Sequence, residues 1–318
     1  MAVAAVIVTY NSADVIDSCL EALSKMGPEM TPIVVDNASS DNTLDLVRAH
    51  GGGRLIANPE NRGFAAAVNQ GEKELGACAT DDSDVILLLN PDVELLTAVD
   101  QLTVSARRHG LAAGRLVDAE GRTQAGFTLR RFPTPGALVC ELFGINRLWS
   151  SNPVNRRYRC LDCDYDQPAL VEQPAGAFLM IRRDVWKKLG GFDEQFYPVW
   201  FEDVDFCRRA VQGGCQIAYV PSVTARHKGG HSVGEIPEGR RATYWCVSLL
   251  RYAAKHFQPG AFRWICAAVA LSSVPRMVVG MIAGRTLSSV GSYLKIMRFA
   301  GHCLVTPRHV RSAAVPVL

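Results

Sequence analysis

The chain has 318 residues, of which 48% are hydrophobic and 20% are charged, and its formal net charge is +3. A chain of this length and composition can bury a substantial core, which excludes wholesale disorder. The small net charge does not indicate nucleic acid binding, and no nucleic-acid partner is expected. The charge is unevenly distributed, because no Asp or Glu follows Glu238 whereas Arg and Lys continue to Arg311.

The start of the chain runs directly from Met1 into an apolar stretch, with no basic leader and too short an apolar segment for a signal peptide. We therefore expect a cytoplasmic protein whose ten cysteines stay reduced. Cys160 and Cys163 form a C-x-x-C motif. Without a second pair or nearby histidines, a structural zinc site is not expected there.

Short apolar runs and amphipathic segments alternate through the first hundred residues. Strands are expected at 3–8, 33–35, 55–56 and 85–89, and helices at 14–25, after Asp41–Asn42, and at 64–75. This alternation indicates an α/β fold, with an open, mostly parallel sheet flanked by helices and right-handed crossovers.

The rest of the chain is less regular. Residues 121–174 show little periodicity and are interpreted as an irregular excursion over the sheet. Beyond them we expect strands at 177–181 and 217–220 and helices at 184–189 and 203–212. The organisation predicted from this pattern is a first domain over residues 1–238 and a basic, amphipathic helical tail over residues 239–318.

Polar residues follow the expected strands, where an open α/β sheet binds its ligands. They are Thr9–Tyr10–Asn11, Asp36–Asn37, Asn58 and Asn90–Pro91–Asp92. Asn, Asp and Pro are also favoured in ordinary turns, which is a sufficient explanation for any one of these loops. Four such loops at the same edge indicate a binding site. A carboxylate at Asp92 can hold Mg²⁺ or Mn²⁺ on a diphosphate.

Two further segments carry groups suited to catalysis. Glu202, Asp203 and Asp205 open an expected helix, where each carboxylate is favoured by about 0.3–1 kcal/mol. Three acids within four residues, preceded by aromatic residues, exceed what capping requires. His227 is followed by a glycine-rich segment that also contains His231, and we expect it in a loop just after the last strand, open to a ligand.

In chain order these segments resemble the family 2 glycosyltransferases, which have the GT-A fold, in the branch that contains rhamnosyltransferases. The matching segments are VIVTYN (6–11), VVDNASSD (34–41), NPENRGFA (58–65), LNPD (89–92), GAF (176–178), GGFDE (190–194), FEDVD (201–205) and His227. They cover about residues 3–232. Each segment alone is a weak indication of the family, but the complete set in this order is specific to it.

The resemblance implies an inverting glycosyltransferase that uses a nucleoside-diphosphate sugar and Mg²⁺ or Mn²⁺. The implied nucleotide-binding residues are Thr9, Tyr10, Asn11, Asp36, Asn61, Arg62 and Gly63, with Asp36 accepting a base N–H. The implied metal ligands are Asp92 and His227. The implied catalytic base is Asp203, with Glu202 beside it and Trp200, Gly176, Ala177 and Phe178 on the acceptor side. Many members have Asp-x-Asp where this chain has Asn90–Pro91–Asp92, which leaves one carboxylate for the metal.

These residue types suit the chemistry, because the metal stabilises charge on the leaving diphosphate while a carboxylate accepts the acceptor's proton. Two influences on the pKa of Asp203 oppose each other. A helix N-terminus lowers the pKa of a carboxyl, whereas desolvation by Trp200 and Phe201 would raise it.

The preferred function is transfer of rhamnose from dTDP-rhamnose to a lipid-linked saccharide acceptor during the assembly of cell-surface polysaccharide. A UDP- or GDP-sugar with a soluble acceptor is an alternative, as is a non-catalytic nucleotide-sugar-binding protein of the same fold. A dinucleotide-binding oxidoreductase is disfavoured because no glycine follows the first strand. A processive synthase is disfavoured because Gln258 stands too far before Arg263–Trp264 for a Q-x-x-R-W motif. The oligomeric state is left open.

The tail is expected to lie on the inner face of the cell membrane, which makes the protein peripheral. Its apolar runs at 265–274 and 277–283 are divided by Pro275–Arg276, and neither reaches the ~20 residues of a membrane span. If the two runs formed one membrane-spanning helix, Arg276 would lie near the bilayer centre, which would cost about 2.5–3.5 kcal/mol of insertion free energy. The alternative is that the tail packs on the enzyme or on a second subunit.

Overall fold

The computed structural model of the chain describes residues 3–27, 30–77, 84–229, 234, 236–282, 287–306 and 310. The chain divides into two compact units. The first comprises Met1–Phe132, Arg159–Glu194 and Glu202–Ser232, and the second comprises Pro133–Tyr158, Gln195–Phe201 and Val233–Leu318. Two segments from before residue 238 therefore belong to the same unit as the tail.

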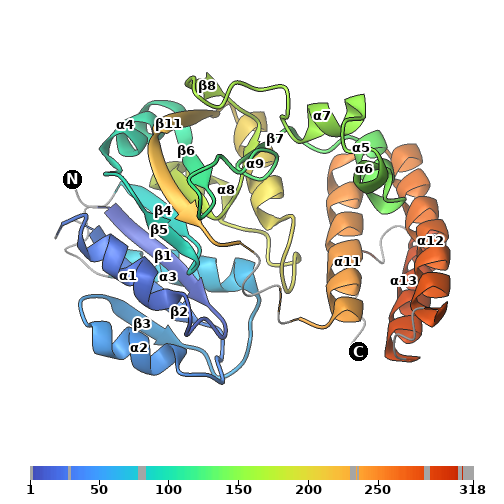
Figure 1. The fold of residues 1–318 in the computed structure, drawn as a ribbon, viewed down its shortest axis with the longest axis horizontal. Coiled ribbons are helices and arrows are strands. Elements are labelled where there is room, and N and C mark those ends of the chain that lie inside the picture. The colour runs from blue at the N-terminus through green and yellow to red at the C-terminus, as the bar shows by residue number, and fades with distance from the viewer. Residues whose placement is uncertain are drawn as a thin grey trace. The chain divides into compact units, whose positions relative to one another are not determined.

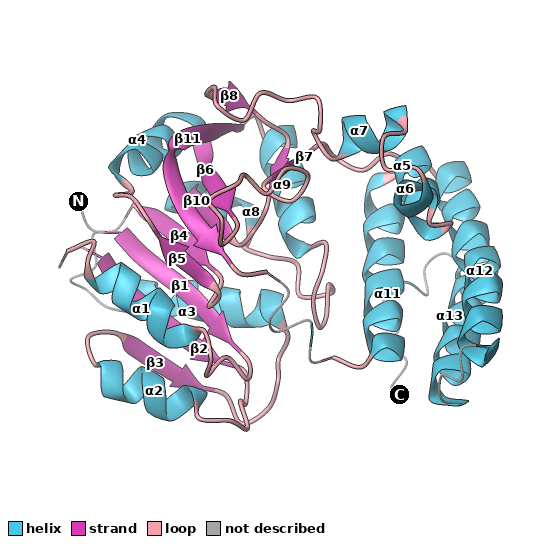
Figure 2. Cartoon of the chain, in the orientation of Figure 1, coloured by secondary structure: helices cyan, strands magenta, loops and turns pink. Residues whose placement is uncertain are grey.

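The first unit is built on a nine-stranded sheet with the order β3-β2-β1-β4-β10-β6-β11-β5, and β8 pairs with β11 (Figure 1, Figure 2). Its strands are β1 (Val3–Thr9), β2 (Met30–Asp36), β3 (Arg54–Ala57), β4 (Val85–Leu89), β5 (Val93–Leu95), β6 (Gly110–Val117), β8 (Ala169–Leu170), β10 (Phe178–Arg182) and β11 (Gln216–His227). The pairs β3-β2, β2-β1, β1-β4 and β6-β11 are parallel, and β10 is antiparallel between β4 and β6. The expected open, mostly parallel sheet is confirmed.

Helices cover both faces of this sheet. They are α1 (Ile16–Ser24), α2 (Thr43–His50), α3 (Phe64–Ala77), α4 (Asp100–His109), α8 (Arg183–Leu189) and α9 (Glu202–Gln212). Side chains of a strand alternate between faces, so Val3, Ala5 and Ile7 of β1 join the core formed with α1 and α4. Ala4, Val6 and Val8 of β1 join the core formed with α3, α8 and α9. A Cβ on Gly71 would lie 2.6 Å from Val6, so glycine allows α3 its close approach to the sheet.

The structure corrects three expectations for the first unit. The last strand was expected at 217–220 but runs to His227, because β11 continues past a register shift between Val220 and Thr224 and pairs with β5. His227 is therefore the last strand residue and does not lie in the loop that follows. Residues 93–117, where no element was expected, form β5, α4 and β6. The segment 121–174, expected to be irregular, contains β8, three short helices, and the strands β7 (Leu129–Arg130) and β9 (Gln173–Pro174), which pair with each other.

The second unit is helical. Its helices are α5 (Pro135–Leu142), α6 (Ile145–Leu148), α7 (Pro153–Tyr158), α11 (Glu238–His256), α12 (Pro259–Ile282) and α13 (Leu287–Val305). Helices α11, α12 and α13 pack side by side, and α12 also contacts α5 (Figure 1). Helix α12 continues through Pro275, the residue at which the two apolar runs of the tail are divided in the sequence. Arg276 donates from Nη2 to the Leu142 carbonyl at 2.7 Å, which ties α12 to the end of α5. Within the described residues, Pro259–Val278 is the one segment whose length and composition would suit a membrane span.

Candidate active site

The carboxyl ends of β1, β2 and β3 meet at one edge of the sheet, as expected. The register places Thr9 opposite Asp36, and Asp36 opposite Ala57. Thr9 Oγ1 donates to Asp36 Oδ1 at 2.8 Å, and both side chains are completely buried. The backbone N–H of Ser39 donates to Asp36 Oδ2 at 2.9 Å. The Asp36 carboxylate therefore organises the loops after β1 and β2, and contact with a nucleotide base requires those loops to uncover it.

A network of side-chain amides fixes the loop after β3 against the end of β2. Asn37 Nδ2 donates to the Gly63 carbonyl at 3.1 Å, and Asn58 Nδ2 donates to Asn37 Oδ1 at 3.1 Å. The Arg62 N–H also reaches Asn37 Oδ1, at 3.4 Å, and Asn61 Oδ1 accepts from the Gly63 N–H at 2.9 Å. Asn37 was expected among the polar strand ends but not as a nucleotide-binding residue, and it connects the predicted segment Asn61–Gly63 with the Asp36 loop.

Residues Tyr10 and Asn11 follow Thr9 at the same edge. Asn11 adopts a left-handed backbone conformation with φ 47°, and its Oδ1 accepts the Ser40 N–H at 2.8 Å. Its own N–H donates to Ser39 Oγ at 2.9 Å. Tyr10 is partly exposed, and its N–H donates to Ser12 Oγ at 3.2 Å. The predicted nucleotide-binding residues thus converge on one edge.

Asp92 and His227 lie together, although 135 positions separate them in the sequence. The antiparallel pairing of β5 with β11 places His227 opposite Val93, directly after Asp92. His227 Nε2 lies 3.6 Å from Asp92 Oδ2, and both side chains are buried. The Gly229 N–H donates to the same Oδ2 at 3.2 Å. His231 lies outside the described residues.

The segment around Gln124 and Phe127 holds the His227 ring in place, and sequence reasoning missed it. His227 Nδ1 lies 2.8 Å from Gln124 Oε1, while Gln124 Nε2 donates to the His227 carbonyl at 2.8 Å. Because an amide oxygen only accepts, Nδ1 carries the proton and Nε2 presents its lone pair toward Asp92. The Phe127 ring stacks on the imidazole at 4.7 Å. Burial lowers the pKa of His227, against the opposing charge of Asp92, so the neutral ring is favoured.

Asp203, in the first turn of α9, is held by backbone donors. The Gly176 N–H donates to Asp203 Oδ2 at 3.0 Å, and the Val204 N–H donates to Oδ1 at 2.8 Å. A Cβ on Gly176 would lie 2.9 Å from the Asp203 Cβ, so glycine is required for this approach. Desolvation raises the pKa of Asp203, and the backbone donors and the charge of Arg130 oppose that effect. Burial therefore outweighs the helix N-terminus.

The other acids beside Asp203 are less accessible. Glu202 is 4% exposed, and Asp205 is completely buried in an ion pair with Arg209 at 2.7 Å. Asp203 is partly exposed and faces the Gly176 backbone, so it is the carboxylate best placed to meet a substrate. Trp200 belongs to the second compact unit and has a left-handed backbone with φ 80°.

One short segment connects the Asp92 and Asp203 regions. The Asn90 N–H donates to the Ala177 carbonyl at 3.0 Å, and Phe178 pairs with Leu89. Ala177 and Phe178 are buried in the core, so any influence on an acceptor passes through their backbone. Gly176, one residue earlier, touches Asp203. The turn Asn90–Asp92 and the carboxylate of Asp203 are thus fixed to the two residues that lead into β10.

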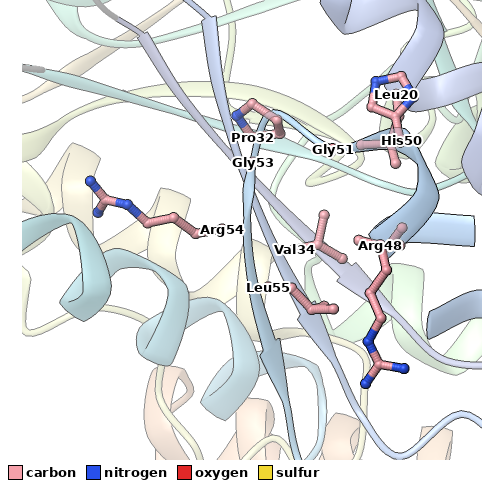
Figure 3. A pocket seen from close by; sticks show the side chains of 10 residues that line it. Leu20, Pro32, Val34, Arg48, His50, Gly51, Gly53, Arg54 and Leu55 are labelled. Carbon is pink, nitrogen blue, oxygen red and sulfur yellow. The ribbon is translucent and has the colours of Figure 1, made fainter. Parts of the chain in front are cut away.

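No cluster of three or more His, Cys, Asp or Glu side chains suited to a metal occurs in the part of the chain that the structure describes. A small pocket near the amino ends of β2 and β3 is lined by residues that include Pro32, Arg48, His50 and Arg54 (Figure 3). It lies opposite the strand ends that carry the predicted site, and the side chains of Arg48 and Arg54 point away from each other. We assign it no part in the candidate site.

Comparisons with known proteins identify the family of the chain. Residues 4–123 match the family described as "Glycosyl transferase family 2", and residues 157–244 match "Glycosyltransferase like family 2". The chain is similar to N-acetylglucosaminyl-diphospho-decaprenol L-rhamnosyltransferase of Mycobacterium tuberculosis, with 28% identity over 79% of this chain and 84% of that protein. It is also similar to rhamnosyltransferase WbbL of Escherichia coli, with 27% identity over 71% of this chain and 83% of that protein.

A likeness to a solved structure supports the fold. GalNAc-T7, crystallised with UDP, GalNAc and Mn²⁺, aligns with a TM-score of 0.53 and 14% identity. The alignment covers 80% of this chain and 50% of that one. At this identity the likeness concerns architecture alone.

Proposed function

Because this chain is a glycosyltransferase of family 2 with the GT-A fold, we propose that it transfers rhamnose from dTDP-rhamnose to a saccharide hydroxyl, with inversion. The observation that carries the proposal is that the proposed metal-binding region and the proposed base are hydrogen-bonded to neighbouring residues of one segment. The turn Asn90–Asp92, which carries one member of the Asp92–His227 pair, is hydrogen-bonded to Ala177, and the Asp203 carboxylate is hydrogen-bonded to Gly176. A donor diphosphate at the first and an acceptor at the second would meet between them.

The Asp92–His227 pair fits a divalent ion such as Mg²⁺ or Mn²⁺. It offers a carboxylate oxygen and the unprotonated Nε2 of a neutral imidazole, and Gln124 fixes that tautomer from the other side of the ring. Two protein ligands suffice where phosphate oxygens and water complete the coordination. When bound, the ion would neutralise charge on the donor's diphosphate.

Asp203 is proposed as the general base. The acceptor hydroxyl forms a bond to the anomeric carbon, its proton passes to the Asp203 carboxylate, and the bond from that carbon to the diphosphate oxygen breaks. A single displacement of this kind inverts the anomeric centre. Desolvation raises the pKa of Asp203, which makes it a stronger base than an exposed aspartate. Gly176, Ala177 and Phe178 would shape the acceptor side.

The nucleotide would lie over the edge formed by the ends of β1, β2 and β3. Thr9, Tyr10, Asn11 and Asp36 would hold the base, and Asn61, Arg62 and Gly63 would flank the nucleotide. The hydrogen-bonded loops described above support this placement, because each predicted residue belongs to one connected network or directly follows it.

The names of the two relatives favour rhamnose as the sugar, and that of the mycobacterial relative favours a lipid-linked saccharide diphosphate as the acceptor. Such an acceptor resides in a membrane, so we propose that the protein is cytoplasmic and peripheral, binding the inner face of the cell membrane through the tail 239–318. Trp264 is 77% exposed and Leu271 is 62% exposed, one heptad apart on α12. An exposed apolar stripe on a chain segment without acids suits an interface with anionic lipid.

The first test is nucleotide release from dTDP-, UDP- and GDP-sugars, with and without an acceptor lipid extract. Release of dTDP from dTDP-rhamnose that depends on acceptor supports the proposal. Release from a UDP- or GDP-sugar would reassign the donor. Binding of nucleotide sugars without turnover under any of these conditions would favour the non-catalytic alternative.

A further inference from the structure

Arg130 occupies a position between the two parts of the candidate site. It lies in β7, and its Nε donates to the Gly126 carbonyl at 2.9 Å. Its guanidinium carbon lies 5.9 Å from the centre of the Phe127 ring. Over the described residues, neither of its two terminal nitrogens has a protein acceptor. The Nε bond fixes the arginine stem, which leaves the charged end available to a ligand.

On one side, Arg130 is linked to the proposed metal ligands. Phe127, over which its guanidinium lies, stacks on the His227 imidazole with the two rings inclined by 15°. His227 in turn faces Asp92. The guanidinium therefore approaches the His227 side of the site from across one aromatic ring.

On the other side, Arg130 is linked to Asp203. The pairing of β7 with β9 places Arg130 opposite Gln173, and the Ala175 N–H donates to the Thr128 carbonyl at 3.0 Å. The next residue, Gly176, donates to the Asp203 carboxylate. The positive charge of Arg130 also lowers the pKa of Asp203, against the larger effect of burial, although the two side chains form no ion pair.

We propose that Arg130 is a catalytic residue that binds the donor's diphosphate and stabilises the negative charge on it as the leaving group departs. This proposal rests on the proposed function. As the bond from the anomeric carbon to the diphosphate oxygen breaks, its electron pair stays on that oxygen, and the N–H groups of Arg130 donate to the phosphate that carries it. The acceptor's proton goes to Asp203. An arginine suits this task because its planar guanidinium remains charged and can donate two parallel hydrogen bonds to a phosphate.

The test compares Arg130→Gln with Arg131→Gln, since Arg131 is the neighbouring arginine and its guanidinium lies 3.5 Å from Asp162. Calorimetry with Mn²⁺ present measures the affinities for dTDP and for thymidine. Arg130→Gln should weaken dTDP binding about tenfold and leave thymidine binding unchanged, because only dTDP carries the diphosphate. Its kcat should fall by ~10²–10³, as when one preorganised donor to a developing anion is lost. Arg131→Gln should retain the wild-type dTDP affinity and kcat.

The outcomes separate this inference from the proposed function. If the wild type binds none of dTDP, UDP and GDP, the proposed function fails and the role of Arg130 falls with it. If the wild type binds and turns over its donor while Arg130→Gln matches it in dTDP affinity and kcat, only the role of Arg130 is refuted. An effect confined to the KM of the acceptor, with dTDP affinity unchanged, also contradicts the assignment to the donor. Arg130→Lys should recover part of the lost kcat, since it restores the charge without the planar donor pair.

Discussion

Replacing Asp203 with Asn tests the proposed base with little change in shape. The two carboxylate oxygens each accept one backbone N–H, from Gly176 and from Val204. An amide has one oxygen, so in either orientation its NH₂ group would face one of these donors. Leaving one buried donor unsatisfied costs about 1–3 kcal/mol.

A second effect of the same substitution has the opposite sign. Because the pKa of Asp203 is raised in the folded protein, its contribution to stability is full below the pKa of the unfolded chain and is lost as the pH rises through the folded pKa. At neutral pH the ionised carboxylate therefore lowers the free energy of unfolding, and a neutral amide relieves that cost. We expect the two effects to offset each other in part, so that the midpoint of thermal unfolding shifts by a few degrees at most.

The effect on turnover should be far larger than the effect on stability. Loss of a general base typically lowers the rate by ~10²–10⁴, equivalent to about 2.7–5.5 kcal/mol in the activation free energy. The assay is steady-state transfer, together with the dissociation constant of the donor, which should stay within a few-fold. Asp205→Asn is the matched control, because it removes a carboxylate of the same turn that is ion-paired with Arg209. It should lose stability and retain kcat. If Asp203→Asn turns over nearly normally while Glu202→Gln is inactive, the base is Glu202.

Two further predictions concern the metal and the membrane. Excess EDTA should abolish transfer, Mg²⁺ or Mn²⁺ should restore it, and Asp92→Ala should weaken donor binding; full activity in EDTA would show that the metal role is wrong. Gln124→Ala should weaken Mn²⁺ binding, measured by electron paramagnetic resonance, by ~10–100-fold, because Gln124 no longer holds the proton of His227 on Nδ1. The protein should float with anionic liposomes at low salt, and Trp264→Glu with Leu271→Glu should reduce flotation, whereas Val104→Glu on α4, also at an exposed apolar residue, should not. If the wild type stays unbound, the tail is a packing element.

The strand ends that carry the predicted nucleotide-binding residues could be predicted from the sequence because each is marked by a local sequence pattern. Each apolar run ends at a polar residue, and parallel strands carry such ends to one edge. The structure pairs Thr9 with Asp36 at that edge. The approach of Asp92 to His227 was predicted only through the resemblance, since a contact across 135 positions has no local pattern.

The segment from Gln124 to Arg130 could not have been identified in the same way. It has no hydrophobic periodicity, its strand β7 has two residues, and its partners in β9 and at His227 are distant in sequence. Pro275 shows the opposite case, because a proline in a helix interior usually kinks or ends the helix. Helix α12 continues through the proline while packing against α11, α13 and α5. Tertiary contacts decided both cases.

The charge of Arg130 also affects the base strength of Asp203 and leads to a last prediction. In the free enzyme, Arg130 and two backbone donors restrain a pKa that burial raises. A bound diphosphate would partly neutralise Arg130 and bring negative charge near Asp203, and both changes favour the protonated carboxyl. The pKa of Asp203 should therefore be higher with donor bound, so the carboxylate becomes a stronger base once the leaving group is in place.

The pH dependence of the two rate parameters separates these states, because kcat/KM reports the free enzyme and kcat reports the complex. Since the base must be ionised, both should rise with pH through inflections above about 3.9, the ordinary value for aspartate. The inflection in kcat should lie at the higher pH. In Arg130→Gln the inflection in kcat/KM should move upward, because the charge that lowers the pKa of Asp203 is gone. If both inflections coincide in the wild type and stay in place in the variant, donor binding does not alter the base, and the two residues act independently.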